Sequence, residues 1–469
     1  MRTNPYITRA ILLGTAFAAS SCMMGPDFKP VDMPMPAAFR GAGASTESIA
    51  DLPWWKVFKN KDLQDLLTDT YNNNRDLKAA MARVEKARQY ITITEAPLFP
   101  WADYSGSVSK GSNYTGGSIV QTTGTTLTPG ALAAGISWEL DIWGKLRRAS
   151  EAAQAELLAS EEALHGMQAS LVATVARYYF QLSTLHDTLT ITERSARNQA
   201  EVLRLIKRLS AAGISSAAEE RQQESALAAT EASLPTLRRQ IAETENALSL
   251  LLGRNPGAFR LDVPPKLALP GLIPPGLPSR LLEQRPDIRQ AEARLMAANA
   301  RVGEAKAMFF PSLSLTAIFG GVSTSLADVV HGRAPAVASI GPNLLQPLFA
   351  GGQIYFNREA AQARLDQAVI NYRKTILNAL GEVANGLVAY ETSDALMETQ
   401  ARRVAASREA MRLADLRFRA GTTNFLEVLD TQRQLLAAET QEAQALLERR
   451  QALISIYLAL GGGWQATGR

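Results

Sequence analysis

The sequence predicts a mainly α-helical fold with a smaller β portion, built as two copies of one plan. Three observations predict it. The chain of 469 residues matches itself at a nearly constant offset, and two proline-free stretches of about 65 residues are rich in Ala, Leu, Glu, Gln and Arg. Shorter segments with alternating apolar residues precede each stretch. Each copy should therefore contain a strand pair followed by a long helical hairpin.

Composition and charge exclude several classes of protein. The 49 basic and 45 acidic residues leave a net charge of +4, which gives no case for a nucleic-acid partner. The hydrophobic residues make up 46% of the chain, enough for a large core. A single cysteine excludes an intramolecular disulfide and any cysteine-clustered metal site, and only three histidines are available for ligation by imidazole. No metal cofactor is expected.

The amino end reads as an export signal. Two arginines, an apolar run over residues 11–19 and two serines precede Cys22, the order found in secretory leaders. The run is too short to span a bilayer. We therefore predict a signal peptide over residues 1–21 and a lipid on Cys22 after cleavage. A soluble amino-terminal helix with an incidental cysteine is the alternative.

The body of the chain is a duplication. Asp76 aligns with Asp287 at an offset of 211 (287 − 76), and Gly213 aligns with Gly421 at an offset of 208 (421 − 213). Residues 151–155 and 359–363 are identical. We predict repeat 1 over residues 75–253 and repeat 2 over 286–461. A segment over 22–74, a Pro-rich linker over 254–285 and a tail over 462–469 complete the chain.

Each repeat should open with a helix and a strand pair. The helices are predicted over residues 75–96 and 287–308, and each ends near a proline. The strands are predicted over 101–110 and 131–141 in repeat 1, and over 312–321 and 335–347 in repeat 2.

The strand patterns predict a sheet with one apolar and one polar face. Apolar residues alternate with small or polar ones with a period of two. We predict that the apolar set faces lipid and the serines face water; the two sets are Ile136, Trp138, Leu315 and Phe319, and Ser137 and Ser314. A soluble sheet packed on a core has the same pattern.

Long helices should follow, over residues 145–209 and 353–418. At about 1.5 Å per residue each would be a rod on the order of 100 Å long. The chain should turn at Gly213 and Gly421 and return as helices over 216–252 and 423–460. A return helix and a leading helix placed end to end would match the length of one rod.

These elements constrain the assembly. A transmembrane barrel needs about eight strands or more, whereas one chain offers four. Open sheet edges cannot face lipid. Either the strands lie outside the membrane, or several chains contribute them to one barrel, and the predicted lipoprotein leader favours the shared barrel.

Three motifs carry a specific resemblance. Residues 281–288 (LLEQRPDI), 138–144 (WELDIWG) and 25–28 (GPDF) resemble the TolC-like outer-membrane factors, in particular the NodT/OprM-type lipoproteins of RND efflux systems. Trp54, Trp55 and residues 425–433 also fit. The resemblance implies a homotrimer with a twelve-stranded transmembrane barrel, four strands per chain, continued by an α-helical tunnel across the periplasm. It also implies a mixed equatorial domain built from segments near Trp54, from 264–284 and from the carboxyl end.

The resemblance implies a function in transport. The protein would be the lipid-anchored exit duct of a tripartite system in the bacterial outer membrane, docked to a periplasmic membrane-fusion adaptor and an inner-membrane RND pump. A conduit for type I protein secretion is the alternative within the channel class. A trimeric surface adhesin and an acyl-anchored helical scaffold are alternatives from other classes. The exported compound cannot be predicted, since the pump would select it.

Signals for an enzyme are weak. Glu162 and His165 have the Glu-x-x-His spacing of di-iron bundles, but that chemistry needs a second such pair. Neither His186 nor His331 has a glutamate three residues before it. No phosphate-binding loop or nucleophile elbow is present in the sequence. We predict passage rather than catalysis, with no cofactor besides the lipid on Cys22.

The turns at Gly213 and Gly421 should form the periplasmic tip, where the resemblance places the adaptor contact and the closed aperture. Met411, Asp415 and Phe418 share one helix face at i, i+4 and i+7, with Arg419 beside them. The offset of 208 puts Lys207 opposite Asp415 (415 − 207). We hypothesise that Asp415 narrows the pore and is held by cations of neighbouring helices, from the set Arg204, Lys207, Arg208 and Arg419. An ordinary exposed ion pair is the alternative.

Overall fold

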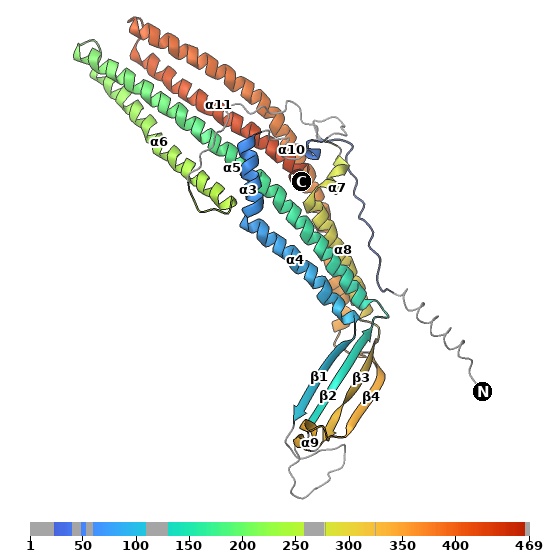
Figure 1. The fold of residues 1–469 in the computed structure, drawn as a ribbon. Coiled ribbons are helices and arrows are strands. Elements are labelled where there is room, and N and C mark those ends of the chain that lie inside the picture. The colour runs from blue at the N-terminus through green and yellow to red at the C-terminus, as the bar shows by residue number, and fades with distance from the viewer. Residues whose placement is uncertain are drawn as a thin grey trace. The chain divides into compact units, whose positions relative to one another are not determined.

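The computed structural model describes residues 23–39, 48–52, 60–108, 130–257, 276, 278–323 and 325–464 (Figure 1). The predicted signal peptide, Cys22, Trp54 and Trp55 lie outside these residues, as do most of the Pro-rich linker and the last part of the tail. The chain divides into two compact units. The first contains residues 23–32, 83–161 and 290–372, and the second contains the rest.

The first unit contains a four-stranded antiparallel sheet. Its strands are β1 (Trp101–Val108), β2 (Gly130–Leu140), β3 (Ser312–Ser323) and β4 (Ala336–Leu345), in the order β1-β2-β3-β4. These bounds lie close to the predicted ones, except that residues 109 and 110 are outside the described part. A short helix, α9 (Leu326–Val330), joins β3 to β4. The central pair, β2 and β3, joins the two repeats, and β1 and β4 form the edges.

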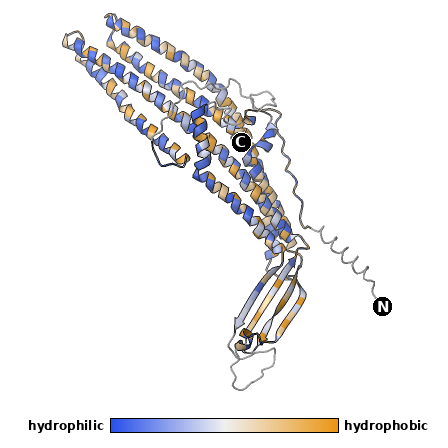
Figure 2. Ribbon diagram, in the orientation of Figure 1, coloured by the Kyte–Doolittle hydropathy of each residue, from blue (hydrophilic) through white to orange (hydrophobic). Residues whose placement is uncertain are grey.

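The register places the predicted apolar residues on one face. Directly paired residues of antiparallel strands point to the same side of a sheet. Trp138 pairs with Leu315, Ile136 with Ala317, and Ala134 with Phe319. The residues between them, Ser137 and Ser314 among others, point to the opposite side. Figure 2 shows the apolar colour recurring along the strands. Phe319 is 66% exposed, so this apolar face is uncovered within one chain.

The first unit also contains parts of four longer helices. They are the later part of α4 (Arg75–Glu95), most of α8 (Pro286–Ala307), and the first parts of α5 (Lys145–Ala211) and α10 (Gln353–Arg419). A short helix with Pro97 follows α4, and α8 ends before Pro311, as the prolines predict. Val302 and Ala305 of α8 pack on Ala361 and Leu365 of α10 in a small apolar cluster.

The second unit is a set of packed helices. It contains α3 (Lys61–Asn73), α6 (Ala217–Leu251), α7 (Leu281–Gln284), α11 (Phe425–Ala459) and the later parts of α5 and α10. The whole helices α5 and α10 are 67 residues long each. The helix α3 is not among the helices expected from the sequence. Asn60 caps it by accepting from the Leu63 N–H at 2.9 Å, and Leu63, Leu66 and Leu67 form its buried face. No described helix is both long and apolar enough to cross a membrane.

Candidate functional site

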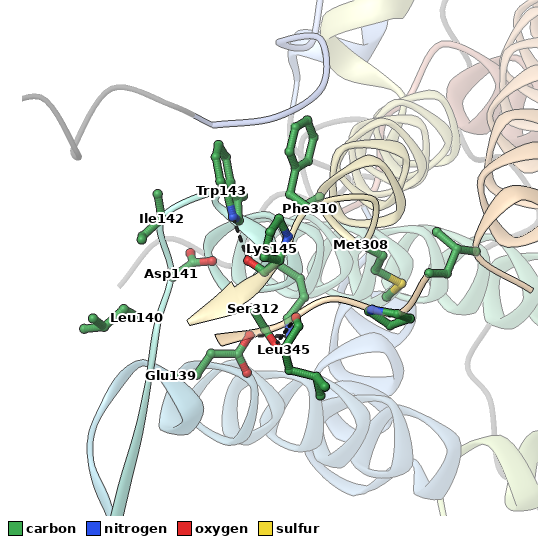
Figure 3. Close-up of a pocket in the computed structure, with 14 residues that line it drawn as sticks. Glu139, Leu140, Asp141, Ile142, Trp143, Lys145, Met308, Phe310, Ser312 and Leu345 are labelled. Carbon is green, nitrogen blue, oxygen red and sulfur yellow. Dashed lines mark hydrogen bonds and ion pairs between the residues drawn. The ribbon is translucent and has the colours of Figure 1, made fainter. Parts of the chain in front are cut away.

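The motif at residues 138–144 fastens β2 to α5 (Figure 3). The Trp143 ring stacks on Phe310 with a centroid separation of 4.6 Å, and its Nε1–H donates to the Pro311 carbonyl at 2.9 Å. The Asp141 carboxylate accepts from the backbone N–H of Arg147 at 2.9 Å, which satisfies a free donor in the first turn of α5. The motif therefore fixes the end of the sheet on the helices that follow and precede it.

A hollow lies at this end of the sheet. Side chains from β2, α5, the end of α8 and the start of β3 line it, and Lys145 forms an ion pair of 2.5 Å with Glu139 (Figure 3). Nearby, the half-buried Trp138 donates its Nε1–H to the Leu98 carbonyl at 2.8 Å. Tryptophans with an apolar body and a satisfied N–H are typical of the boundary between lipid and water.

The motif at residues 281–288 fastens the second unit. Arg285 is buried and donates to the Ala459 carbonyl at the end of α11 at 2.7 Å. The same guanidinium contacts the carboxylates of Asp287 at 2.7 Å and Glu382 at 2.8 Å. Burial opposes the charge, but the two carboxylates outweigh it and the pKa of Arg285 is raised. The motif thus ties the start of repeat 2 to the last helix.

The segments that the resemblance groups into an equatorial domain meet around this motif. Gln284 donates to Asp51 at 2.9 Å, and its own carbonyl accepts from the Trp464 indole at 3.2 Å. The Tyr457 hydroxyl donates to the Leu52 carbonyl at 2.9 Å. Burial raises the pKa of this hydroxyl, which keeps it protonated as a donor. Chain regions from near the amino end, the linker and the carboxyl end therefore lie together.

Both predicted hairpin turns use glycine. Gly213 and Gly421 have φ of +73° and +71°, a conformation that other residues rarely adopt. The N–H of Ile214 returns to the Leu209 carbonyl at 2.8 Å, and that of Thr422 returns to the Arg417 carbonyl at 2.9 Å. These bonds satisfy the free carbonyls at the ends of α5 and α10. Among the described residues, no atom lies within 4 Å of a Cβ added at either glycine, so it is the positive φ rather than a close contact that requires glycine at these turns.

An apolar cluster lies beneath these turns. Phe425 and Ile206 are fully buried in it, together with residues of α6 and α10. Phe418 packs edge-on against the Phe425 ring with centroids 5.8 Å apart. Phe418 is thus a packing residue that joins the end of α10 to the start of α11. From its spacing alone, Phe418 is expected only to share a helix face with Met411 and Asp415.

The residues predicted to form the gate lie on α10 and α5. Asp415 pairs with Arg419 of its own helix at 2.8 Å, and the carboxylate is about a quarter exposed. Within the described part of one chain this is a contact along α10, the ion pair that the sequence gives as the alternative, and the role of Asp415 in the gate stays a prediction. Met411 lines a small cavity between α5, α10 and α11. Lys207 is an exposed residue of α5.

A carboxylate that the sequence reasoning missed lies beside that cavity. Glu439 of α11 is 8% exposed and accepts from Arg194 of α5 at 2.6 Å and from Arg408 of α10 at 3.0 Å. Gln432 also faces the cavity, and both of its amide atoms are buried without a hydrogen-bond partner among the described residues. Glu439 therefore links three helices of the hairpins by charge. No local motif marks it, because its partners are distant in the sequence.

A second missed charge is Arg450 of α11, which is 1% exposed. Its guanidinium lies over the Phe180 ring of α5 at 5.1 Å, and its Nε and Nη1 find no partner among the described residues. Burial lowers the pKa of Arg450, and burial raises the pKa of the nearby Asp187. An arginine in an otherwise amphipathic helix gives no sequence signal of such burial.

Glu162 and His165, the pair with Glu-x-x-His spacing, take part in ion-pair and packing contacts. Glu162 binds Arg289 at 2.6 Å and contacts His165 at 3.3 Å, and the His165 ring packs against Trp464. No cluster of three His, Cys, Asp or Glu side chains suited to a metal occurs among the described residues.

Comparison with known proteins identifies the family. A family model described as outer membrane efflux protein matches residues 66–254 and 277–462. The same model thus matches each half, at offsets of 211 (277 − 66) and 208 (462 − 254) that equal those seen in the sequence.

Similar proteins match over nearly the whole chain. The cation efflux system protein CusC of Escherichia coli is 32% identical over 96% of this chain and 97% of its own. The pyoverdine export protein OpmQ of Pseudomonas putida is 34% identical over 92% of each. A solved structure of the outer-membrane channel OprN is 32% identical, with a TM-score of 0.85 over 95% of this chain and all of that one. Together these matches show that the chain is a member of the outer membrane efflux protein family.

Proposed function

We propose that three copies of the chain form the exit duct of a tripartite RND-type efflux system in the outer membrane, docked to a periplasmic adaptor and an inner-membrane pump. The observation that carries the proposal is the two-faced sheet of four strands. Its apolar face is uncovered in one chain, and its edge strands β1 and β4 have no neighbour among the described residues.

The open edges of β1 and β4 determine how this sheet can be placed in a membrane. In lipid, every backbone N–H and C=O must be paired, so a sheet with two open edges has no stable place there. Pairing β4 of one copy with β1 of the next removes both edges. Three copies supply twelve strands, above the roughly eight that the smallest membrane barrels require. The alternating polar face then lines a water-filled interior, and the helices continue that passage into the periplasm.

The cargo is set elsewhere in the system. Relatives named for export of cations, pyoverdine and toluene match this chain at 32–34% identity over more than nine tenths of its length. Proteins named for such different cargoes share one architecture. This supports a conduit that passes what a pump delivers, without a catalytic step of its own.

The lipid on Cys22 belongs to the same proposal. The cysteine follows a leader-like segment, and a lipid would place the chain at the membrane before its strands insert. Cys22→Ala should abolish labelling by a radioactive fatty acid. Label persisting at the wild-type level would contradict the anchor.

Detergent extraction followed by sizing tests the channel. An SDS-resistant trimer that conducts ions in planar bilayers is expected, whereas a monomer that needs no detergent would support the helical scaffold. Cross-linking in cells and purification through a carboxyl-terminal tag then identifies the partner. Recovery of an RND pump with its adaptor supports efflux. Recovery of an ABC exporter would instead favour the type I secretion conduit.

A further inference from the structure

We propose that Arg148, Asn299 and Gly303 form a binding site for the main chain of residues 23–27, the first residues after Cys22. By filling this site the segment sets where the lipid leaves the protein and joins the anchor to the base of the sheet. The inference rests on the lipid anchor proposed above. The ligand is a peptide of this chain with a bend at Gly25, recognised through its carbonyl groups and through the absence of a side chain at glycine.

Arg148 is the centre of the site. It lies in the first turn of α5 and is 1% exposed. Its Nε donates to the Met24 carbonyl at 3.1 Å, and its Nη2 donates to the Gly25 carbonyl at 3.3 Å and to Asp27 at 3.0 Å. Its Nη1 donates to Glu151 at 2.6 Å. A buried guanidinium needs partners for its donors, and the segment supplies three of these four acceptors.

Two further contacts hold the peptide. Asn299 of α8 donates its amide to the Pro26 carbonyl at 2.9 Å. The Met24 N–H donates to the Trp143 carbonyl at 3.1 Å. The segment therefore bridges α8, the start of α5 and the motif that ends β2. Trp143 is the residue that stacks on Phe310, so the peptide lies directly on the fastening at the base of the sheet.

Glycines make the close approach possible. Gly25 has φ +94°, and a Cβ added there would lie 2.5 Å from the Gly303 Cα. A Cβ added at Gly303 would lie 2.7 Å from the Met24 carbonyl oxygen. Both distances are shorter than real Cβ contacts allow. The backbone of the segment thus fits against the backbone of α8 only because neither residue has a side chain.

The duplicated half provides an internal comparison. The offset of 208 places Phe356 at the position of Arg148, and the offset of 211 places Arg88 and Thr92 at those of Asn299 and Gly303. Phe356 lacks the guanidinium of Arg148, Arg88 lacks the amide of Asn299, and Thr92 has a side chain where Gly303 has none. Phe356 is 66% exposed. Arg148, Asn299 and Gly303 are therefore not repeated at the equivalent positions of the other half. They occur only at the copies of these positions that contact the amino-terminal segment.

The site changes what a lipid on Cys22 can do. An acyl chain on a flexible tether anchors the chain weakly and leaves the sheet free to move away from the membrane. Met23 follows Cys22 directly, so a lipid would begin one residue before the docked peptide. Docking then holds the base of the sheet next to the anchored end and raises its effective concentration at the membrane.

Two variants test the site from opposite sides. Gly25→Val alters only the segment and should clash with Gly303, whereas Arg148→Ala removes the donors. The matched control is Arg301→Ala on α8, which breaks an exposed ion pair with Glu156. Hydrogen exchange detected by mass spectrometry reports on the Met24 amide in peptides that begin at or before Cys22 and extend to about residue 32. Fatty-acid labelling and the yield of SDS-resistant trimer are measured in the same preparations.

We expect exchange of the Met24 amide to speed up at least about tenfold in both variants and the trimer yield to fall several-fold, with lipid labelling unchanged. The control should match wild type in all three. Unchanged exchange in Gly25→Val would overturn the site, and this holds even if Arg148→Ala fails to accumulate. Faster exchange with a full yield of trimer would overturn the link to the sheet. Absence of label in the wild type would refute the lipid anchor separately, because exchange does not depend on it.

Discussion

Arginine substitutions at two adjacent residues of β3 provide the sharpest test of the membrane assignment. Ala317 pairs with Ile136 and Ile340 on the apolar face, whereas Thr316 pairs with Ser137 and Gly341 on the polar face. The two residues lie at nearly the same depth along the strand but point to opposite sides. We expect Ala317→Arg to be strongly destabilising and Thr316→Arg to be tolerated.

The expected magnitude follows from the length of the strand. β3 has 12 residues, which at about 3.4 Å each make about 40 Å, or about 30 Å of height at the usual tilt of 35–45°. Ala317 lies near the middle of that height, where an arginine facing lipid costs about 2–4 kcal/mol. An arginine facing water costs little of this. The two equilibrium constants for insertion should therefore differ by about 30-fold or more.

The assay is folding into lipid vesicles from urea, followed by the fraction of chain that resists SDS. Ala317→Arg should need a lower urea concentration to insert than wild type or Thr316→Arg, and its outer-membrane level in cells should fall. Ser314→Arg serves as a second substitution on the polar face. Equal losses for Ala317→Arg and Thr316→Arg would refute the lipid-facing assignment, and a larger loss for Thr316→Arg would reverse it.

Three further outcomes are expected. Arg285→Ala should destabilise the protein by about 3 kcal/mol in urea titration because it removes a buried charged hydrogen bond, and Arg285→Lys should recover only part of this; a loss below 1 kcal/mol would contradict the fastening role. Ser216→Ala should cost about 1 kcal/mol at neutral pH by removing the capping box of α6. The Ser215 hydroxyl and the Ser216 backbone N–H donate to the Glu219 carboxylate and lower its pKa, so the stabilisation from Glu219 should be present at neutral pH and be lost as pH falls through the lowered value; Glu219→Gln tests this, and a pH-independent cost of that substitution would count against it. Asp415→Ala should raise conductance or open probability in planar bilayers, and an unchanged conductance would remove Asp415 from the gate.

Long-range regularity made much of the fold predictable. Gly213 and Gly421 mark the turns because only glycine readily takes their positive φ, and prolines mark the ends of α4 and α8. The helix α3 does have a local signal, since Leu63, Leu66 and Leu67 have the i, i+3, i+4 spacing of a buried helix face and Asn60 is a favourable N-cap. It was missed because it lies outside the two repeats. What the sequence cannot show is the distant contact at its end, in which the Asn74 amide donates to the Leu251 carbonyl at 2.9 Å.

The candidate site was less predictable than the fold. The ion pair of Asp415 with Arg419 follows from their spacing on one helix. Glu439 joins arginines 245 and 31 residues away, and nothing near it in the sequence distinguishes it from other glutamates. Arg148 likewise stands among several basic residues at the start of α5. Only the fold shows which of them is buried and which partner it meets.

The pairing of β2 with β3 has an evolutionary consequence. It joins a strand of one repeat to a strand of the other, so each chain is in effect two fused subunits whose outer strands, β1 and β4, come from different repeats. A ring of three such chains contains six β-hairpins, and the pairing of β4 with β1 of the next chain would mimic the pairing of β2 with β3 inside each chain. An ancestor of half the length could therefore have closed the same ring as six identical subunits. Fusion freed the two halves to diverge, and Arg148 and Phe356 at matching positions record that divergence.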